Sequence, residues 1–123
     1  VDAIATDHAP HSEEDKAAGA AGMVGSETAF GVCYTKLCRG EGLPLEALSV
    51  LMSERPAQIL GLNKGRLEPG YDADLVLVDL DTPYTVKREN LHSKSKNSPY
   101  DGAQLYGRVC ATIKGGCLTY QAD

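Results

Sequence analysis

The sequence lacks several features that would assign it to a functional class at once. It has no cluster of lysine and arginine and a formal net charge of -5, which argues against a nucleic-acid partner. No apolar run approaches the ~20 residues that a membrane-spanning helix needs, and no signal peptide is visible. No C-x-x-C pair occurs among the four cysteines, Cys33, Cys38, Cys110 and Cys117. Because these cysteines sit in ordinary apolar patterns, we expect reduced thiols in a cytoplasmic protein rather than a disulfide framework.

The chain also lacks an initiator methionine, and it begins inside a structural pattern. Val1 to Ala5 already read as the middle of a strand. A chain of 123 residues is long enough for one small domain. Its start nevertheless leads us to expect the C-terminal portion of a longer protein.

The opening stretch is predicted to be a buried strand followed by a long loop. Residues 1–6 form the expected strand, and residues 8–26 are rich in alanine and glycine. Loops of this length tend to be functional or disordered. Within the loop, Ser12 is a plausible N-cap for a short helical start that extends to Lys16.

Two helices are expected next, because apolar residues recur at helical spacing. The first runs from Ser26 to about Arg39, and Gly40 ends it. The second begins at Pro44, a favoured first-turn position. It is predicted to break at Arg55-Pro56, because the residue before a proline is pushed out of the α region. A further short turn should end at Gly61.

The second half of the chain changes from helical to extended patterning. The stretches expected as strands are Leu75–Val78, Tyr84–Val86, Leu105–Lys114 and Cys117–Tyr120. The valine-rich Leu75–Val78 suits a strand covered on both faces. Residues 88–101 are polar and read as an exposed connection. Gly115-Gly116 is a strong two-residue hairpin signal, so the last two stretches should pair with each other.

Asp7 lies at a position where catalytic residues are common. Asp7 follows the opening apolar run, and Pro10 cannot continue a strand because it lacks an N–H group. His8 and His11 lie on the loop beyond. In a (β/α)-barrel, catalytic groups sit at this end of a strand. An aspartate after a strand is more often a turn or cap residue, so position alone leaves both readings open.

Three blocks of sequence resemble, in order, those of dihydroorotases, which are members of the cyclic amidohydrolase family. Thr6-Asp7-His8-Ala9-Pro10-His11 is similar to the signature that follows the last barrel strand of these enzymes. Gly22–Thr28 resembles the family's next block. Lys64–Asp79 resembles the amidohydrolase C-terminal strand block, so the resemblance spans most of the chain.

The resemblance implies the fold class. It is an α/β chain, the C-terminal part of a metal-dependent (β/α)8-barrel hydrolase with part of its flanking small β-sandwich domain. Residues 1–62 would supply the last barrel strand, the active-site loop and the terminal helices. Residues 63–123 would supply the C-terminal part of the flanking β domain, which in the family also uses residues from the N-terminus of the full chain.

The resemblance also implies an activity, the reversible zinc-dependent hydrolysis of the cyclic amide of dihydroorotate to N-carbamoyl-aspartate in pyrimidine biosynthesis. A metal lowers the pKa of bound water to about 7, which supplies a nucleophile, and a neighbouring carboxylate can relay a proton to the leaving nitrogen. Asp7 would ligate the metal and act as base and then acid. His11 would bind the substrate's carboxylate, and the backbone amides of Ala21 and Gly22 would contact its ring. The family often has a larger residue at the position of Ala21, which leaves the role of Ala21 open.

The chain does not carry the family's other metal ligands, which are a His-x-His pair, a carboxylated lysine and two further histidines. Its only histidines are His8, His11 and His92. We interpret His8 as a structural residue or one that orients a ligand, and His92 as a surface residue. One carboxylate and one imidazole cannot close a zinc site, which needs three or four ligands. We therefore expect the isolated chain to be inactive and not to retain the Zn²⁺ of the full-length enzyme.

Three alternatives stay open. The first is a hydantoinase (dihydropyrimidinase) or allantoinase, enzymes that typically place another residue at the position of His11. The second is a catalytically dead dihydroorotase-like partner of aspartate transcarbamoylase; the presence of both Asp7 and His11 favours an active parent. The third is a free-standing β-rich binding module, which would leave the opening strand without partners. The partners we expect are the small-molecule substrate, the rest of the barrel and further copies in a homo-oligomer.

Overall fold

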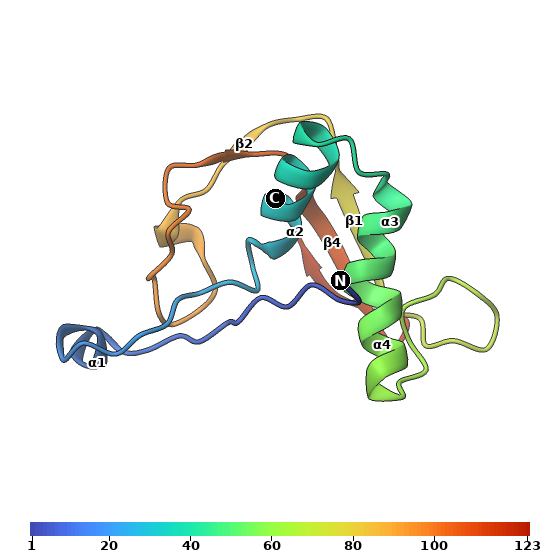
Figure 1. Ribbon diagram of the computed structural model, residues 1–123, viewed down its shortest axis with the longest axis horizontal. Helices are drawn as coiled ribbons and strands as arrows, with labels where there is room; N and C mark the ends of the chain where they lie inside the picture. Colours follow the sequence, from blue (N-terminus) through green and yellow to red (C-terminus); the bar gives the residue numbers. More distant parts are fainter.

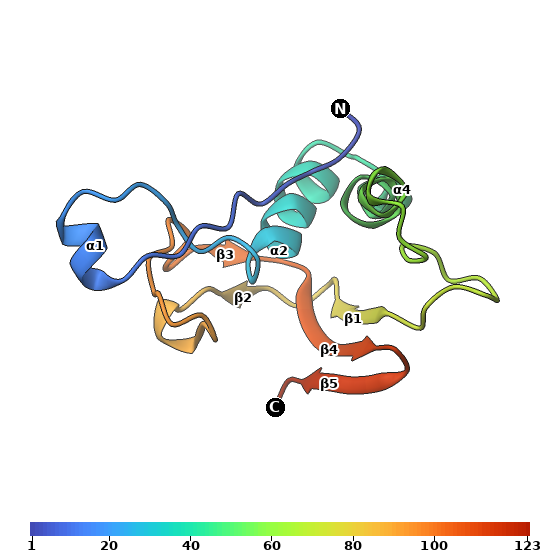
Figure 2. The same ribbon diagram turned by 90° about the horizontal axis from the view of Figure 1, so that it is seen from below.

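In the computed structural model, which describes residues 1–123, the longer helices lie on one side of a small antiparallel sheet (Figures 1 and 2). The helical elements are α1 (Glu13–Ala17), α2 (Ala29–Cys33), the π-helix η1 (Tyr34–Gly40), α3 (Leu45–Ser49), the π-helix η2 (Val50–Glu54), α4 (Arg55–Leu60) and the 3₁₀ turn η3 (Arg88–Asn90). The strands are β1 (Leu75–Asp79), β2 (Tyr84–Thr85), β3 (Gln104–Leu105), β4 (Arg108–Lys114) and β5 (Cys117–Gln121). The chain is thus a mixed α/β structure, in agreement with the predicted class. None of its helices has the length and apolar character to cross a membrane.

The strand expected over residues 1–6 is not formed, so this prediction was wrong. The segment is extended and runs beside the helices, where the N–H of Ile4 donates to the carbonyl oxygen of Leu51 at 2.9 Å. A strand exists through hydrogen bonds to a neighbouring strand, and every strand of this chain pairs elsewhere. The apolar pattern is therefore present without the partner that would turn it into a strand.

The short helix predicted at Ser12 and the helix predicted from Ser26 form close to their expected bounds. Ser12 caps α1 as expected: its Oγ accepts a hydrogen bond from the N–H of Asp15 at 3.0 Å and donates to the Asp15 carboxylate at 2.7 Å. The hydrogen bond that the Ser12 hydroxyl donates lowers the pKa of the Asp15 carboxyl. Helix α2 begins at Ala29 rather than at Ser26, then continues through η1 to Gly40, where the sequence predicted its end.

The break predicted at Arg55-Pro56 was wrong, because α3, η2 and α4 form one continuous helix from Leu45 to Leu60. Pro56 lies in the first turn of α4, directly after the π-helix η2. The wider turn of a π-helix rearranges the hydrogen-bond ladder locally, so a residue without an N–H group is tolerated there. Gly61 ends the helix as predicted, in the left-handed conformation with φ 66° and ψ 33°.

The hairpin predicted at Gly115-Gly116 is confirmed. Strands β4 and β5 pair antiparallel, with Lys114 opposite Cys117, and β1 pairs with the other edge of β4 to give the order β1-β4-β5. The short strands β2 and β3 form a separate pair. The expectation that β1 is covered on both faces was wrong: Val76 is 54% exposed and its neighbour Leu77, on the opposite face, is 51% exposed. Within this chain, too little structure packs on either face of β1 to exclude solvent.

The core is small, with 9 of 123 residues buried. Its fully buried side chains are Leu48 of α3 and Val24, which precedes α2. Helix α2 packs closely against the strand pair β2–β3 because Gly31 lies directly against the hydroxyl of Tyr84. The polar connection 88–101 is exposed over most of its length, as predicted, but it anchors itself through the buried Leu91.

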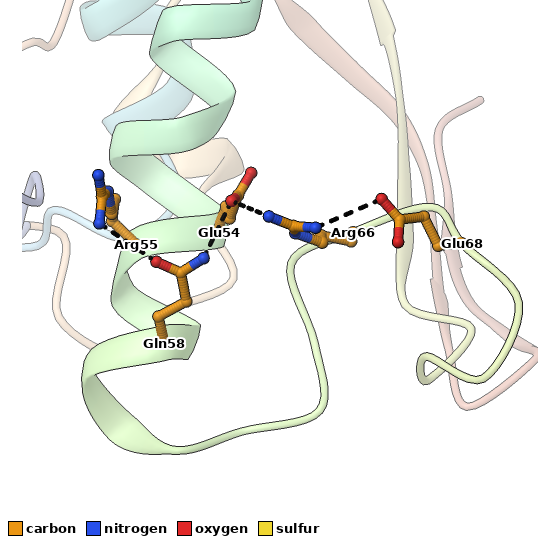
Figure 3. A network of polar contacts seen from close by, with 5 residues as sticks. All are labelled: Glu54, Arg55, Gln58, Arg66 and Glu68. Atoms are coloured by element: carbon orange, nitrogen blue, oxygen red, sulfur yellow. Dashed lines mark hydrogen bonds and ion pairs between the residues drawn. The ribbon is translucent and has the colours of Figure 1, made fainter.

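Ion pairs attach the loop after α4 to the rest of the molecule. Arg66 donates to Glu54 of η2 at 2.6 Å and lies 3.5 Å from Glu68, while Gln58 donates to the same Glu54 carboxylate at 3.0 Å (Figure 3). The hydrogen bond from Arg66 lowers the pKa of the Glu54 carboxyl. Exposed ion pairs of this kind contribute little each, about 0–1 kcal/mol, so they fix the course of the loop more than they stabilise the fold.

A second ionic cluster joins the same loop to the β4–β5 hairpin. Lys64 lies 2.8 Å from Asp72 and 2.5 Å from Asp74. The other oxygen of Asp74 accepts the N–H of Gly115 at 2.8 Å. The block Lys64–Asp79 that the sequence singled out therefore consists of a connector between the helices and the hairpin, up to Asp74, and of strand β1.

Candidate functional site

The predicted site centres on residues Thr6–His11, the aspartate segment, which extends away from the helices toward α1 (Figure 1). Asp7 has φ 48°, and it is the only residue other than glycine with a positive φ in the chain. This left-handed conformation is uncommon outside glycine, and such outliers cluster at functional positions. Its side chain is exposed. The turn therefore presents the carboxylate to the space outside the chain.

A second stretch, Gly22–Ser26, the glycine segment, runs parallel to the aspartate segment. The N–H of Ala9 donates to the carbonyl oxygen of Met23 at 2.9 Å, and His8 and Met23 form a parallel bridge. The His8 side chain adds two contacts, because its Nδ1 accepts from the N–H of Gly25 at 3.1 Å and of Ser26 at 3.2 Å. The aspartate segment and the glycine segment, which belong to separate sequence blocks, thus form one structural unit.

Gly22 brings the two segments into closest contact. A Cβ atom at Gly22 would lie 2.9 Å from Cδ2 of His11 and would overlap the carbonyl oxygen of Ala9. The residue has φ 134°, which favours glycine. His11 and Gly22, two residues predicted to bind substrate, are therefore neighbours. Ala21 precedes Gly22 and is exposed.

Three residues that the sequence analysis did not single out hold this arrangement. Lys16 Nζ donates to the carbonyl oxygens of Ala20 at 2.7 Å and Gly22 at 2.9 Å. Asn97 Nδ2 donates to the same Gly22 oxygen at 2.9 Å, and the carbonyl of Asn97 accepts the N–H of Val24 at 2.9 Å.

The third residue is Glu27, whose carboxylate oxygens accept the N–H groups of His92 at 2.7 Å and Ser93 at 2.8 Å. Because its partners lie more than 60 residues away, no local pattern could have revealed this contact. With Asn97, it ties the connection 88–101 to the residues around the glycine segment.

The side chains of this chain do not assemble a complete set of zinc ligands. No group of three or more histidine, cysteine, aspartate or glutamate side chains comes together in the structure. The Nδ1 lone pair of His8 is already occupied by two backbone donors. His92 is exposed, as predicted, and its ring lies edge-on to Tyr120 at 5.7 Å, far along the chain from Asp7. Asp7 can offer one carboxylate ligand, whereas a catalytic zinc centre needs three protein ligands.

A cavity of about 540 Å³ lies between α2, the stretch from β2 to His92 and the three-stranded sheet. Its lining includes Tyr84, Arg108 and Tyr120 but neither Asp7 nor His11. Burial raises the pKa of the Tyr84 hydroxyl, which fits its packing role against Gly31. The cavity therefore does not include the predicted catalytic side chains, although Ser26 of the glycine segment and Glu27 belong to its lining.

Comparison with known proteins gives a consistent set of relatives. A family model described as the amidohydrolase family matches residues 1–120. A dihydroorotase from Clostridium botulinum is 53% identical over 121 residues, which are 98% of this chain and 30% of that protein. A dihydroorotase from Ruminiclostridium cellulolyticum is 48% identical over 94% of this chain and 28% of its own length. The chain thus spans about 30% of the length of the curated relatives it matches.

Solved structures give a closely related picture. An L-hydantoinase (dihydropyrimidinase) from Arthrobacter aurescens superimposes with a TM-score of 0.91 at 33% identity, over 98% of this chain and 29% of that chain. A D-hydantoinase (dihydropyrimidinase) from Thermus sp. superimposes with a TM-score of 0.86 at 24% identity, over 98% of this chain and 28% of that chain. The second match is a likeness of fold alone.

Proposed function

We propose, from the premise that this chain belongs to the amidohydrolase family, that it is the C-terminal part of a dihydroorotase. The complete enzyme would hydrolyse the cyclic amide of dihydroorotate reversibly to N-carbamoyl-aspartate. The observation that carries the proposal is the unit formed by the aspartate and glycine segments, in which the turn at Asp7 and the contact between His11 and Gly22 occur together. The relatives named dihydroorotase, at 53% and 48% identity, support the same reading.

The residues of this chain suggest how they would take part in the reaction. Amide hydrolysis adds the elements of water across the C–N bond, so a proton must leave the attacking water and reach the ring nitrogen. Asp7 would accept that proton as a general base and return it as a general acid. His11 would donate a hydrogen bond to the substrate's carboxylate, since an imidazole suits an anionic ligand. The backbone at Ala21 and Gly22 would contact the ring.

We keep zinc as a proposed cofactor of the complete enzyme, with Asp7 as one of its ligands. The residues of this chain do not make a closed site, so the remaining ligands would come from residues outside the 123 described here. The 123-residue chain by itself is therefore expected to have no dihydroorotase activity. Elemental analysis of the purified chain, alongside the complete enzyme, tests this assignment; stoichiometric zinc and activity in the chain alone would overturn it.

A hydantoinase is the second candidate, because the Arthrobacter aurescens L-hydantoinase shares 33% identity and a TM-score of 0.91 with this chain. His11 is the residue that discriminates. Hydantoin and dihydrouracil lack the ring carboxylate of dihydroorotate that an imidazole at this position would bind. A catalytically dead structural partner is disfavoured by the presence of both Asp7 and His11.

The test uses two substrates that differ only in that carboxylate, dihydroorotate and dihydrouracil. We expect the complete enzyme to prefer dihydroorotate, and His11→Ala to raise its KM for dihydroorotate. A hydrogen bond to a charged group contributes ~1.5–3 kcal/mol, which corresponds to roughly a 10- to 150-fold change. Any activity on dihydrouracil should not change. An unchanged KM for dihydroorotate, or a preference for dihydrouracil in the unmodified enzyme, would contradict the proposal.

The setting of the protein follows from the same proposal. The four cysteines are free thiols, which is in keeping with a cytoplasmic enzyme. Large apolar side chains such as Ile59 and Leu67 are 65% and 80% exposed, and we propose that the rest of the barrel and further copies in a homo-oligomer cover surfaces of this kind.

A further inference from the structure

The side chain of His8 makes contacts that the proposed reaction does not use. Its Nδ1 accepts hydrogen bonds from two successive backbone N–H groups, those of Gly25 at 3.1 Å and Ser26 at 3.2 Å. An atom that accepts hydrogen bonds carries a lone pair, so the ring proton of this imidazole lies on Nε2. The contact crosses 17 and 18 residues of sequence and joins the two segments of the site.

Few other hydrogen bonds link these two segments directly. One backbone hydrogen bond, from Ala9 to Met23, links them directly. They approach closely because Gly25 has no side chain: a Cβ atom there would lie 2.9 Å from the carbonyl oxygen of Thr6. Neither segment belongs to a sheet, so no ladder of hydrogen bonds fixes their relative position.

We propose that His8 is a positioning residue that holds the glycine segment against the turn at Asp7. His8 follows Asp7 directly, so fixing its ring also fixes the backbone of the turn that presents the carboxylate. The same hydrogen bonds locate the segment that begins at Gly22. This inference rests on the proposed function for its effect on catalysis, whereas the contact itself does not depend on it.

The experiment compares two substitutions in the complete enzyme. In His8→Asn, the amide oxygen stands close to the position of Nδ1 and can still accept hydrogen bonds. His8→Leu has a similar size but no acceptor. Because a misplacement of 1 Å can cost ~100-fold in rate, we expect His8→Leu to lower kcat on dihydroorotate 10- to 100-fold. We expect His8→Asn to retain kcat within about threefold, with bound metal at the unmodified level in both variants.

Hydrogen exchange at the amides of Gly25 and Ser26 provides a readout that is independent of activity. We expect exchange to be at least tenfold faster in His8→Leu than in the unmodified enzyme and near the unmodified rate in His8→Asn. Unaltered exchange in His8→Leu, or equal loss of kcat or of metal in both variants, would overturn the positioning role. If the unmodified enzyme does not turn over dihydroorotate, the proposed function fails, and the exchange rates still decide whether His8 holds the two segments together.

Discussion

Replacement of Gly22 by alanine tests the contact between the two site segments. The added Cβ would overlap the carbonyl oxygen of Ala9 and lie 2.9 Å from Cδ2 of His11. The Ala9 carbonyl is a backbone group of the aspartate segment, so it cannot yield without moving that segment, and the His11 ring must also shift. The substitution therefore acts on the site by displacement and leaves the chemistry of every site side chain unchanged.

The magnitude follows from two terms. A residue with a side chain held at φ 134° costs on the order of 1–3 kcal/mol of strain. Ordinary van der Waals contact begins near 3.4 Å, so the imidazole must retreat by about 0.5 Å, and the Ala9 carbonyl by more. Displacements approaching 1 Å can lower a rate ~100-fold. We expect kcat/KM of the complete enzyme for dihydroorotate to fall 10- to 100-fold.

Gly19 provides the matched control. It lies in the same loop with φ 93°, but a Cβ there meets no atom within 4 Å. Gly19→Ala therefore carries comparable backbone strain without the clash, and its kcat/KM should stay within about threefold of the unmodified enzyme. Steady-state kinetics and thermal melting of both variants give the comparison. Equal activities in the two variants would refute the reasoning, because the clash would then have no effect on the site.

Three further predictions concern chemistry, pH and packing. Asp7→Asn should lower kcat ~10²- to 10⁴-fold with an unchanged melting temperature, since asparagine tolerates a left-handed φ; a retained kcat would contradict the role of Asp7. Hydrogen bonds from Lys64 and the Gly115 N–H lower the pKa of Asp74. Their stabilising effect is therefore present above the unfolded pKa of ~3.9 and is lost as pH falls through the folded pKa. The melting temperature measured from pH 7 to pH 2 should therefore decrease less steeply in Asp74→Asn than in the unmodified protein. Gly31→Ala should destabilise the fold by ~1–3 kcal/mol in denaturant titrations, because the added Cβ would overlap the Tyr84 hydroxyl. Adding Tyr84→Phe to this variant removes that hydroxyl and should recover part of the lost stability. If no stability is recovered, the overlap with the Tyr84 hydroxyl is not the cause of the loss.

Features set by short-range chemistry were predictable from the sequence. Ser12 needs only the amide three residues on, Gly61 only its own backbone conformation, and Gly115-Gly116 only the two strands it joins. Each of these predictions is confirmed. The strand over residues 1–6 failed because a strand depends on a partner, and the break at Pro56 failed because the preceding π-helix changes the local hydrogen bonding.

In the candidate site, too, the residues of the local motif could be predicted and the residues that act over long sequence distances could not. The motif identified Asp7, His11 and Gly22, and the structure brings the last two into contact. It gave no indication of Lys16 or Asn97, which both hold the carbonyl of Gly22. Asn97 lies 75 residues from Gly22 in sequence, and its hydrogen bond is a product of folding that no local spacing encodes.

The left-handed turn at Asp7 has a consequence for how this sequence can diverge. With φ 48°, the position accepts asparagine and glycine readily but excludes branched side chains. The replacements that the backbone tolerates best are thus ones that delete the carboxylate while keeping the turn. Under the proposed role of Asp7, a lineage released from selection for catalysis loses its activity through one such substitution and keeps its fold, which is a short route from an enzyme to a structural protein.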